Sequence, residues 1–166
     1  MPEETLLASD DTLGVKVILV SDCEQQKSNY YVVHKSDTLQ FMYFASCKEM
    51  HPFEYKEAAI ISSQQVDNQS LPELILEFEN NGNGFHKELF VIQLEELKIL
   101  FRTEMEAYGQ HVFGEELGDF YGFTNKISFK ENGEIHLEKP INNGEEWLKE
   151  CYKLMDGKYE LKSSKN

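Results

Sequence analysis

Metal sites and nucleophilic sites are most often built from histidine and cysteine, and this chain has five histidines and three cysteines. The closest metal-like pair is Cys47 and His51, whose spacing matches one turn of a helix. Zinc needs three or four protein ligands, and no second pair follows at a suitable spacing. The sequence therefore predicts no metal site, and no motif indicates a cofactor.

Any of the three cysteines, Cys23, Cys47 and Cys151, could act as a nucleophile if a histidine approached it in space. We expect Cys151 to pack in a core instead, because it shares an apolar stripe with Trp147. No GxSxG or HExxH motif occurs. An odd number of cysteines at wide spacings predicts reduced thiols and a cytoplasmic location rather than a disulfide framework.

The segment NNGNG, residues 80–84, raises the question of a phosphate-binding loop. Such a loop opens a helix and ends in Lys followed by Ser or Thr. Here alternating apolar residues lie on both sides, which predicts two strands and no helix. Asn and Gly tolerate positive φ, so the segment is interpreted as a hairpin connection.

Acidic residues dominate the charge of the chain, with thirty acids, sixteen bases and a net charge of −14. Arg102 is the single arginine. Proteins that bind nucleic acid usually present a basic face that is rich in arginine, and a strongly negative field repels polyanions and anionic membranes. The composition therefore argues against direct nucleic-acid or membrane binding and favours a basic protein partner, although acidity for solubility alone is an alternative.

The acids are densest between Glu73 and Asp119, where aromatic residues lie among them. A face of this kind can attract a basic partner electrostatically and hold it with aromatic anchors. The alternative is a solvated helix face beside a loop that folds over the core. The predicted partner-binding residues are Glu95, Glu96, Glu104, Glu106, Tyr108, Glu115, Glu116, Asp119, Phe120 and Tyr121.

Period-two patterns predict strands over 15–20, 30–35 and 38–45, and on both sides of NNGNG. A further hairpin over 126–138 has a three-residue loop with Gly133 in the left-handed conformation. This loop pairs Phe129 with Ile135 and leaves His136 on the polar face. Residues 47–72 are ambiguous: Pro52 could begin a short helix that ends near Ile61, with a loop over 62–72.

Two helices are predicted from apolar residues at spacings of three and four. The first covers 94–108 and ends at Gly109. The second covers 143–157, with Asn143 as the cap and a buried stripe that contains Trp147 and Cys151. Between them, residues 109–123 combine glycines, aromatic residues and acids and are expected to form a loop.

Together these elements predict an α+β fold, with a mainly antiparallel sheet of about six to seven strands and two principal helices packed on one face. The expected organisation is a loose leader over 1–14 without signal-peptide character, a single domain over 15–158, and a tail over 159–166.

The sequence favours a non-catalytic acidic binding protein, of the inhibitor or immunity type that neutralises a basic nuclease or toxin in a bacterial or phage setting. One alternative is an enzyme or small-molecule binder that uses loop 109–123, with His111, Glu115, Glu116 and Asp119 as its polar groups. Another is a structural or phage-type assembly subunit. Homo-oligomer formation is compatible with each of these three readings.

Overall fold

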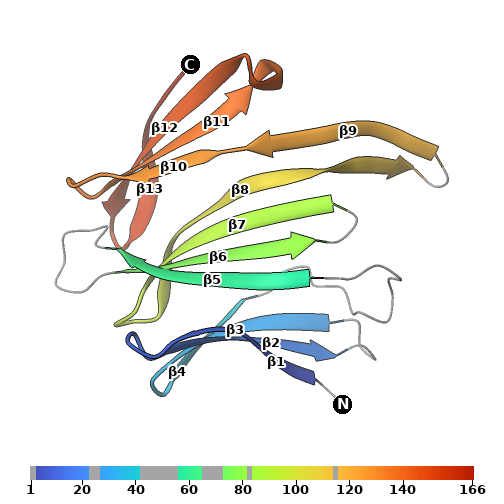
Figure 1. Ribbon diagram of the computed structural model, residues 1–166. Helices are drawn as coiled ribbons and strands as arrows, with labels where there is room; N and C mark the ends of the chain where they lie inside the picture. Colours follow the sequence, from blue (N-terminus) through green and yellow to red (C-terminus); the bar gives the residue numbers. More distant parts are fainter. Residues whose placement is uncertain (1–2, 23–26, 42–55, 65–72, 82–83, 114–115) are drawn as a thin grey trace.

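The computed structural model describes residues 3–22, 27–41, 56–64, 73–81, 84–113 and 116–166. Within these ranges the chain forms thirteen strands in three antiparallel sheets, which follow one another along the sequence (Figure 1). The first sheet contains β1 (Glu3–Asp10), β2 (Val15–Asp22), β3 (Lys27–His34) and β4 (Asp37–Phe41). The middle sheet contains β5 (Lys56–Gln64), β6 (Glu73–Asn81), β7 (Gly84–Gln93), β8 (Lys98–Phe113) and β9 (Glu116–Thr124). The third sheet contains β10 (Lys126–Phe129), β11 (Glu134–Ile141), β12 (Glu146–Met155) and β13 (Lys158–Lys165).

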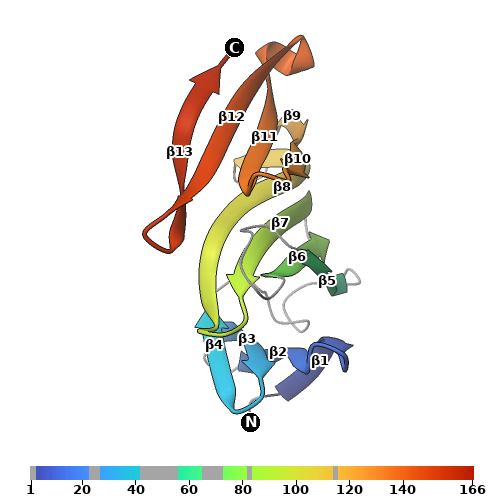
Figure 2. The same ribbon diagram turned by 90° about the vertical axis from the view of Figure 1, so that its left-hand side faces the viewer.

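The middle sheet lies between the other two (Figure 2). Residues of both of its faces are buried in hydrophobic cores. Leu74 and Leu76 of β6 pack in one core with residues of the first sheet, including Val17. Ile75, which lies between them, packs in a second core with Ile135 of the third sheet. Successive side chains of a strand point to opposite faces, so an uninterrupted apolar run is what a strand covered on both sides requires.

Aromatic side chains connect each outer sheet to the middle one. Tyr30 of β3 meets Phe78 of β6 edge-on, with ring centroids 4.8 Å apart. On the other face, Phe101 of β8 meets Tyr152 of β12 at 5.0 Å and Tyr159 of β13 at 6.1 Å. Edge-to-face pairs of this kind add to the free energy gained by burying the rings. The three sheets are therefore held together by both of these cores.

The α+β prediction was wrong, because the described residues contain no α-helix and all of their strands belong to three antiparallel sheets. The predicted helix 94–108 is a turn followed by β8. Register shifts place one extra residue in β8 at Leu100 and another at Met105. Each bulge moves the buried face by one position. Two bulges so close together give a strand the three-and-four spacing of a helix, which explains the error.

The predicted helix 143–157 was also wrong, since it is a short 3-10 turn (Asn142–Gly144) followed by β12. Asn143 has φ +58 and lies inside this turn, whose N-cap position is Ile141, so Asn143 does not act as a helix cap. Trp147 and Cys151 are four residues apart and share one face of β12. A spacing of four fits one face of a strand as well as one face of a helix.

Three other segments differ in part from the expectations. Residues 56–64 form β5 in place of the end of a helix and the start of a loop, while Cys47, His51 and Pro52 lie outside the described residues. The segment 109–123, expected to be a loop, supplies the end of β8 and nearly all of β9. Residues 3–10 of the expected leader form β1, and 158–165 form β13.

No helix of the described part of the chain is long and apolar enough to cross a membrane.

Two hairpin predictions are confirmed. β6 and β7 form an antiparallel pair on either side of residues 82–83, which lie outside the described ranges. β10 and β11 pair Phe129 with Ile135, and Gly133 has φ +78, as the three-residue loop requires. Asp156 and Gly157 form the turn of a third hairpin, which joins β12 to β13, and both residues have positive φ. An Asp-Gly pair is typical of such turns, so this hairpin was also predictable from the sequence.

We predict that Phe90→Ala lowers the free energy of unfolding by about 3–5 kcal/mol, because it leaves a cavity in the core between the first and middle sheets. Urea denaturation would measure the change. Ile60→Ala is the control, since the Ile60 side chain is exposed and its loss should cost less than about 1 kcal/mol. Equal losses in both variants would contradict two-sided burial of the middle sheet.

Candidate functional site

A pocket of about 770 Å³ lies where the middle sheet meets the third sheet. Tyr108 of β8 and residues 122–124 of β9 form one wall. The end of β11, the turn Asn142–Gly144 and Trp147 of β12 form the other wall. The volume falls in the range of ordinary ligand pockets, which makes this the candidate functional site.

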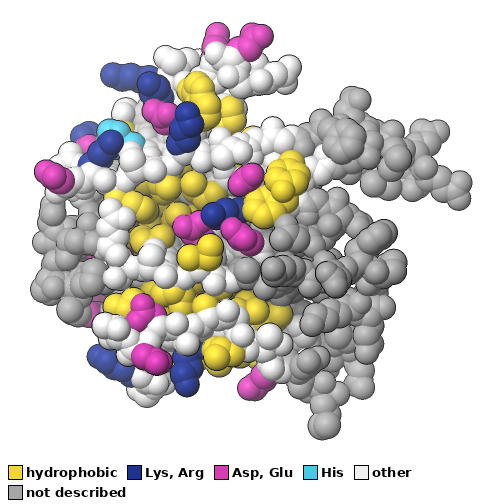
Figure 3. Space-filling view, in the orientation of Figure 1, with side chains coloured by type: hydrophobic (Ala, Val, Ile, Leu, Met, Phe, Trp, Pro, Cys, Tyr) yellow, Lys and Arg dark blue, Asp and Glu magenta, His cyan; other side chains and the backbone are white. Residues whose placement is uncertain are grey.

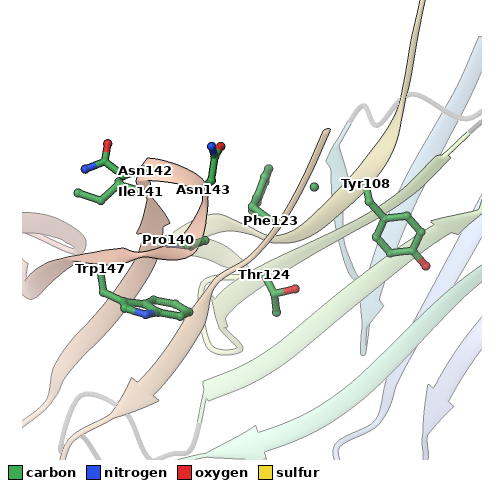
Figure 4. Close-up of a pocket in the computed structure, with 10 residues that line it drawn as sticks. Tyr108, Phe123, Thr124, Pro140, Ile141, Asn142, Asn143 and Trp147 are labelled. Carbon is green, nitrogen blue, oxygen red and sulfur yellow. The ribbon is translucent and has the colours of Figure 1, made fainter. Parts of the chain in front are cut away.

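The pocket is lined by aromatic rings and amides (Figure 4). The Trp147 ring extends from its strand below the turn that carries Asn142 and Asn143, while Phe123 and Thr124 line the pocket from β9. Tyr108 lies at the far end and stacks on Phe85, with ring centroids 5.0 Å apart and an interplanar angle of 16°. These groups offer stacking surfaces and hydrogen bonds, the features by which binding sites hold and orient a ligand.

The Trp147 ring makes a cation–π contact with Lys126. The Lys126 ammonium nitrogen lies 3.9 Å from the centroid of the Trp147 ring. The face of an indole ring is electron-rich and attracts ammonium and guanidinium groups. Lys126 and Trp147 lie on the same face of the third sheet, where Glu138 is the cross-strand partner of Lys126. The pocket wall is therefore suited to a positively charged group.

Asn125 fixes the position of the two sheets at the pocket. It links β9 to β10 and is buried. Its backbone N–H donates to the Met105 carbonyl at 2.6 Å, and its side-chain Nδ2 donates to the Glu104 carbonyl at 2.8 Å. These carbonyls belong to the bulge in β8, where the ladder is interrupted. Asn125 thus supplies hydrogen-bond donors to two carbonyls at the bulge. It also sets the direction in which the chain enters the third sheet.

Negative charge is unevenly distributed along the chain. Residues 1–125 carry twenty-two acids and eight bases, whereas residues 126–166 carry eight of each. The excess charge therefore belongs to the first and middle sheets with their connections. Two exposed carboxylates, Glu145 and Glu146, also follow the pocket turn directly, and Asn142 donates to Glu146 at 3.0 Å. A cation that approaches the pocket meets carboxylates at its rim.

The four predicted acids of 94–108 do not share one face. Glu95 and Glu96 are exposed in the turn between β7 and β8, away from the pocket. The bulge at Met105 separates the other two: Glu104 lies across from Glu88, and Glu106 lies across from Lys87. Glu104 is also 3.3 Å from His86. The acids are therefore distributed over the turn and both faces of the middle sheet.

Of the predicted aromatic anchors, Tyr108 lines the pocket and is half exposed. Glu116, Asp119, Phe120 and Tyr121 belong to β9, of which the structure describes the backbone alone at these positions. Glu115 lies outside the described residues, as do Cys23 and Cys47, and the His111 side chain is not described. Trp147, expected from the sequence in the buried stripe of a helix, instead lines the pocket.

Lys87 is enclosed by acids on the face of the middle sheet that contains Tyr108. Figure 3 shows acidic and basic side chains gathered beside hydrophobic ones over the middle of the molecule. Its ammonium lies 2.5 Å from Glu77 and 3.5 Å from Glu79. Burial alone would lower the pKa of Lys87, but the two carboxylates outweigh this effect and raise the pKa above its ordinary value. Together with Glu106 opposite Lys87, this patch keeps a net negative charge beside the aromatic rings.

A second group of reactive side chains lies on the same face of the third sheet as Trp147. Glu134 and His136 are two residues apart in β11, and His136 pairs with Cys151 of β12. One potential ligand atom from each of the three residues lies within 4.8 Å of the others. Hydrogen bonds from Lys162 and Asn132 lower the pKa of Glu134 to about 2. Burial and the Glu134 carboxylate raise the pKa of the Cys151 thiol.

Comparisons with models of known protein families, with curated protein sequences and with solved structures found no match.

We predict that Asn125→Asp lowers the free energy of unfolding by about 1–3 kcal/mol, because a carboxylate cannot donate to the Glu104 carbonyl. Chemical denaturation would measure the change. Asn143→Asp introduces the same charge at an exposed position and is the control. If the two variants lost equal stability, Asn125 would not anchor the bulge.

The low pKa of Glu134 predicts a specific dependence of stability on pH. The ordinary pKa is 4.5 and the folded value is about 2, so protons bind the unfolded chain first as the pH falls. The pair with Lys162 therefore contributes its full stability above pH 4.5 and loses it progressively toward pH 2. Lys162→Met should be less stable than the wild type at pH 6, and this difference should shrink as the pH falls.

Denaturation midpoints between pH 6 and pH 3 would measure this trend. Lys158→Met removes the same charge from the first residue of β13 and is the matched control. A deficit of Lys162→Met that stayed constant over this range, or one that Lys158→Met shared, would show that the pair does not set the pKa of Glu134.

Proposed function

We propose that the chain is a non-catalytic binding protein that captures a basic protein partner by taking a Lys or Arg side chain of that partner into the Trp147 pocket. The observation that carries the proposal is the Lys126 ammonium, which lies over the Trp147 ring at 3.9 Å. This contact is an intramolecular example of the interaction that a partner's cation would make. A protein of the inhibitor or immunity type, acting on a basic nuclease or toxin in the cytoplasm, is the specific form of this proposal.

The composition of the pocket supports binding of this kind. Tryptophan and tyrosine are the residues that most often dominate binding energy at interfaces, where they fill well-packed pockets. The amides of Asn142 and Asn143 can accept hydrogen bonds from an ammonium or guanidinium group. Tyr108 and Phe123 add apolar surface for the aliphatic part of the same side chain.

The charge of the chain supports rapid and selective encounter with a basic partner. A net charge of −14 produces a long-range field that attracts basic proteins, and the carboxylates of Glu145 and Glu146 adjoin the pocket turn. Charged residues at the rim of an interface act mainly on the association rate, whereas buried aromatic anchors act mainly on dissociation. The two groups of residues therefore make different kinetic contributions.

We predict that Trp147→Ala weakens binding to the basic partner by about 30-fold or more, mainly by faster dissociation. The partner would first be recovered with the tagged protein from host lysate at low salt and then purified for kinetic measurement. Leu161→Ala is the control, because Leu161 is an exposed apolar residue of the same sheet that is not among the residues that line the pocket. Unchanged affinity of Trp147→Ala would contradict the proposal.

We also predict that Glu145→Gln/Glu146→Gln slows association and flattens its dependence on salt, with little change in dissociation. Glu131→Gln/Glu160→Gln removes the same charge from two other exposed positions and is the matched control. The same kinetic assay at several salt concentrations separates local steering at the pocket from the general field of the protein. An equal effect of both double variants would assign the steering to net charge alone.

A small-molecule ligand is a second candidate, favoured by the volume of the pocket and by the pair of amides beside an indole ring. A thermal-shift screen of metabolites against the wild type and Trp147→Ala distinguishes the two functions. A stabilising compound that requires Trp147, together with the absence of a basic protein partner, would favour the small-molecule reading.

A further inference from the structure

We propose that Glu134, His136 and Cys151 form a binding site for a divalent transition metal of the zinc class. This inference is independent of the function proposed for the Trp147 pocket. It rests on the pairing of β11 with β12, which brings Cys151 next to Glu134 and His136. Cysteine sulfur, imidazole nitrogen and carboxylate oxygen are the three kinds of protein ligand that zinc accepts.

The sheet register places the three side chains on one face. His136 and Cys151 are direct cross-strand partners, and side chains at such positions are close neighbours in an antiparallel pair. Glu134 precedes His136 by two positions and therefore points to the same side of β11. The structure gives one ligand atom from each residue, all within 4.8 Å of one another.

Metal binding requires only a small adjustment of this arrangement. Zinc binds sulfur at about 2.3 Å and nitrogen or oxygen at about 2.0–2.2 Å, so ligand atoms in a tetrahedral site are about 3.3–3.8 Å apart. The three groups would each move by about an ångström or less, which side-chain rotation can supply. Three protein ligands leave a fourth position for water.

The imidazole supplies a second observation that points to a ligand. His136 Nε2 is shielded from solvent and makes no hydrogen bond to the residues that the structure describes. Its nearest carboxylate oxygen, Glu134 Oε2, lies 3.5 Å away, which is too long for a good hydrogen bond. Shielded polar atoms are nearly always satisfied in native proteins, and a metal held with Glu134 and Cys151 would satisfy this one.

Lys162 and Asn132 hold the carboxylate without occupying all of it. Lys162 donates to Glu134 Oε1 at 2.8 Å, and Asn132 donates to Oε2 at 2.9 Å. Each carboxylate oxygen can accept two interactions, so Oε2 retains capacity toward His136. Metal-binding carboxylates are commonly oriented by such outer hydrogen bonds. Lys162 comes from β13, so the site would connect three strands of the third sheet.

The ligand set selects among metals. A thiolate and an imidazole favour zinc and cobalt over calcium and magnesium, which prefer oxygen ligands. Cobalt(II) is therefore a suitable spectroscopic probe, because a thiolate bound to cobalt produces a ligand-to-metal charge-transfer absorption that water and carboxylate ligands do not produce.

The test uses the full chain with Cys23→Ser and Cys47→Ser, which leaves Cys151 as the sole thiol. Cobalt(II) titration should give the thiolate absorption with one metal per chain, and zinc should displace the cobalt and raise the thermal midpoint. Adding Cys151→Ser should abolish the absorption, and His136→Asn should weaken binding at least tenfold.

Glu138→Gln is the matched control, because this carboxylate lies on the same face of β11 but is not one of the three ligands. It should bind cobalt as the parent does, and urea denaturation of each variant checks that it is folded. No thiolate absorption in the folded parent protein, or full cobalt binding by the folded Cys151→Ser variant, would overturn the proposal.

Discussion

The burial of both faces of the middle sheet is the constraint on which the rest of the structure depends. Leu89, Phe90, Val91 and Ile92 are consecutive in β7, and all four are buried. A strand with this composition cannot leave either face in water without exposing a large apolar surface. It therefore requires one sheet on each side, and the first and third sheets meet this requirement. The pocket exists because the third sheet must turn back over β8 and β9.

The position of the pocket follows from a local defect in that same sheet. A bulge in β8 interrupts the ladder at Met105, and Asn125 donates hydrogen bonds to the carbonyls of Met105 and of Glu104, the residue before it. The chain leaves the middle sheet at this point and enters β10. Trp147 then reaches the same region from β12, together with the turn that carries Asn142 and Asn143. A polar contact inside the fold thus determines where the aromatic walls of the pocket meet.

The strands and tight hairpins were the features most accessible from the sequence. The Asn132-Gly133 loop fixed the pairing of β10 with β11, because a shift by one residue would have moved Ile127 and Phe129 to the polar face. The two predicted helices failed for a physical reason. Bulges displace the alternation of β8, and a spacing of four residues in β12 satisfies a strand face as well as a helix face. The Asp156-Gly157 turn would have identified β12 as half of a hairpin.

The candidate sites were less predictable, because they depend on which strands become neighbours. Tyr108 was selected as an anchor from its acidic and aromatic surroundings, and it does line the pocket. Trp147 was assigned to a helix stripe, so its role as a pocket wall could not be inferred. His136 and Cys151 become partners only when β11 pairs with β12. The predicted helix 143–157 would separate His136 from Cys151. With that helix in place of β12, the sequence gives no indication that the two residues cluster with Glu134.

Amide hydrogen exchange along the chain is the most direct test of the central claim, that the doubly covered middle sheet organises the molecule. We expect the amides of residues 74–76 and 89–92 to exchange slowest, at rates set by global unfolding, and those of the edge strands β1 and β13 to exchange faster. Exchange in the middle sheet that is as fast as in β1 and β13 would contradict the claim.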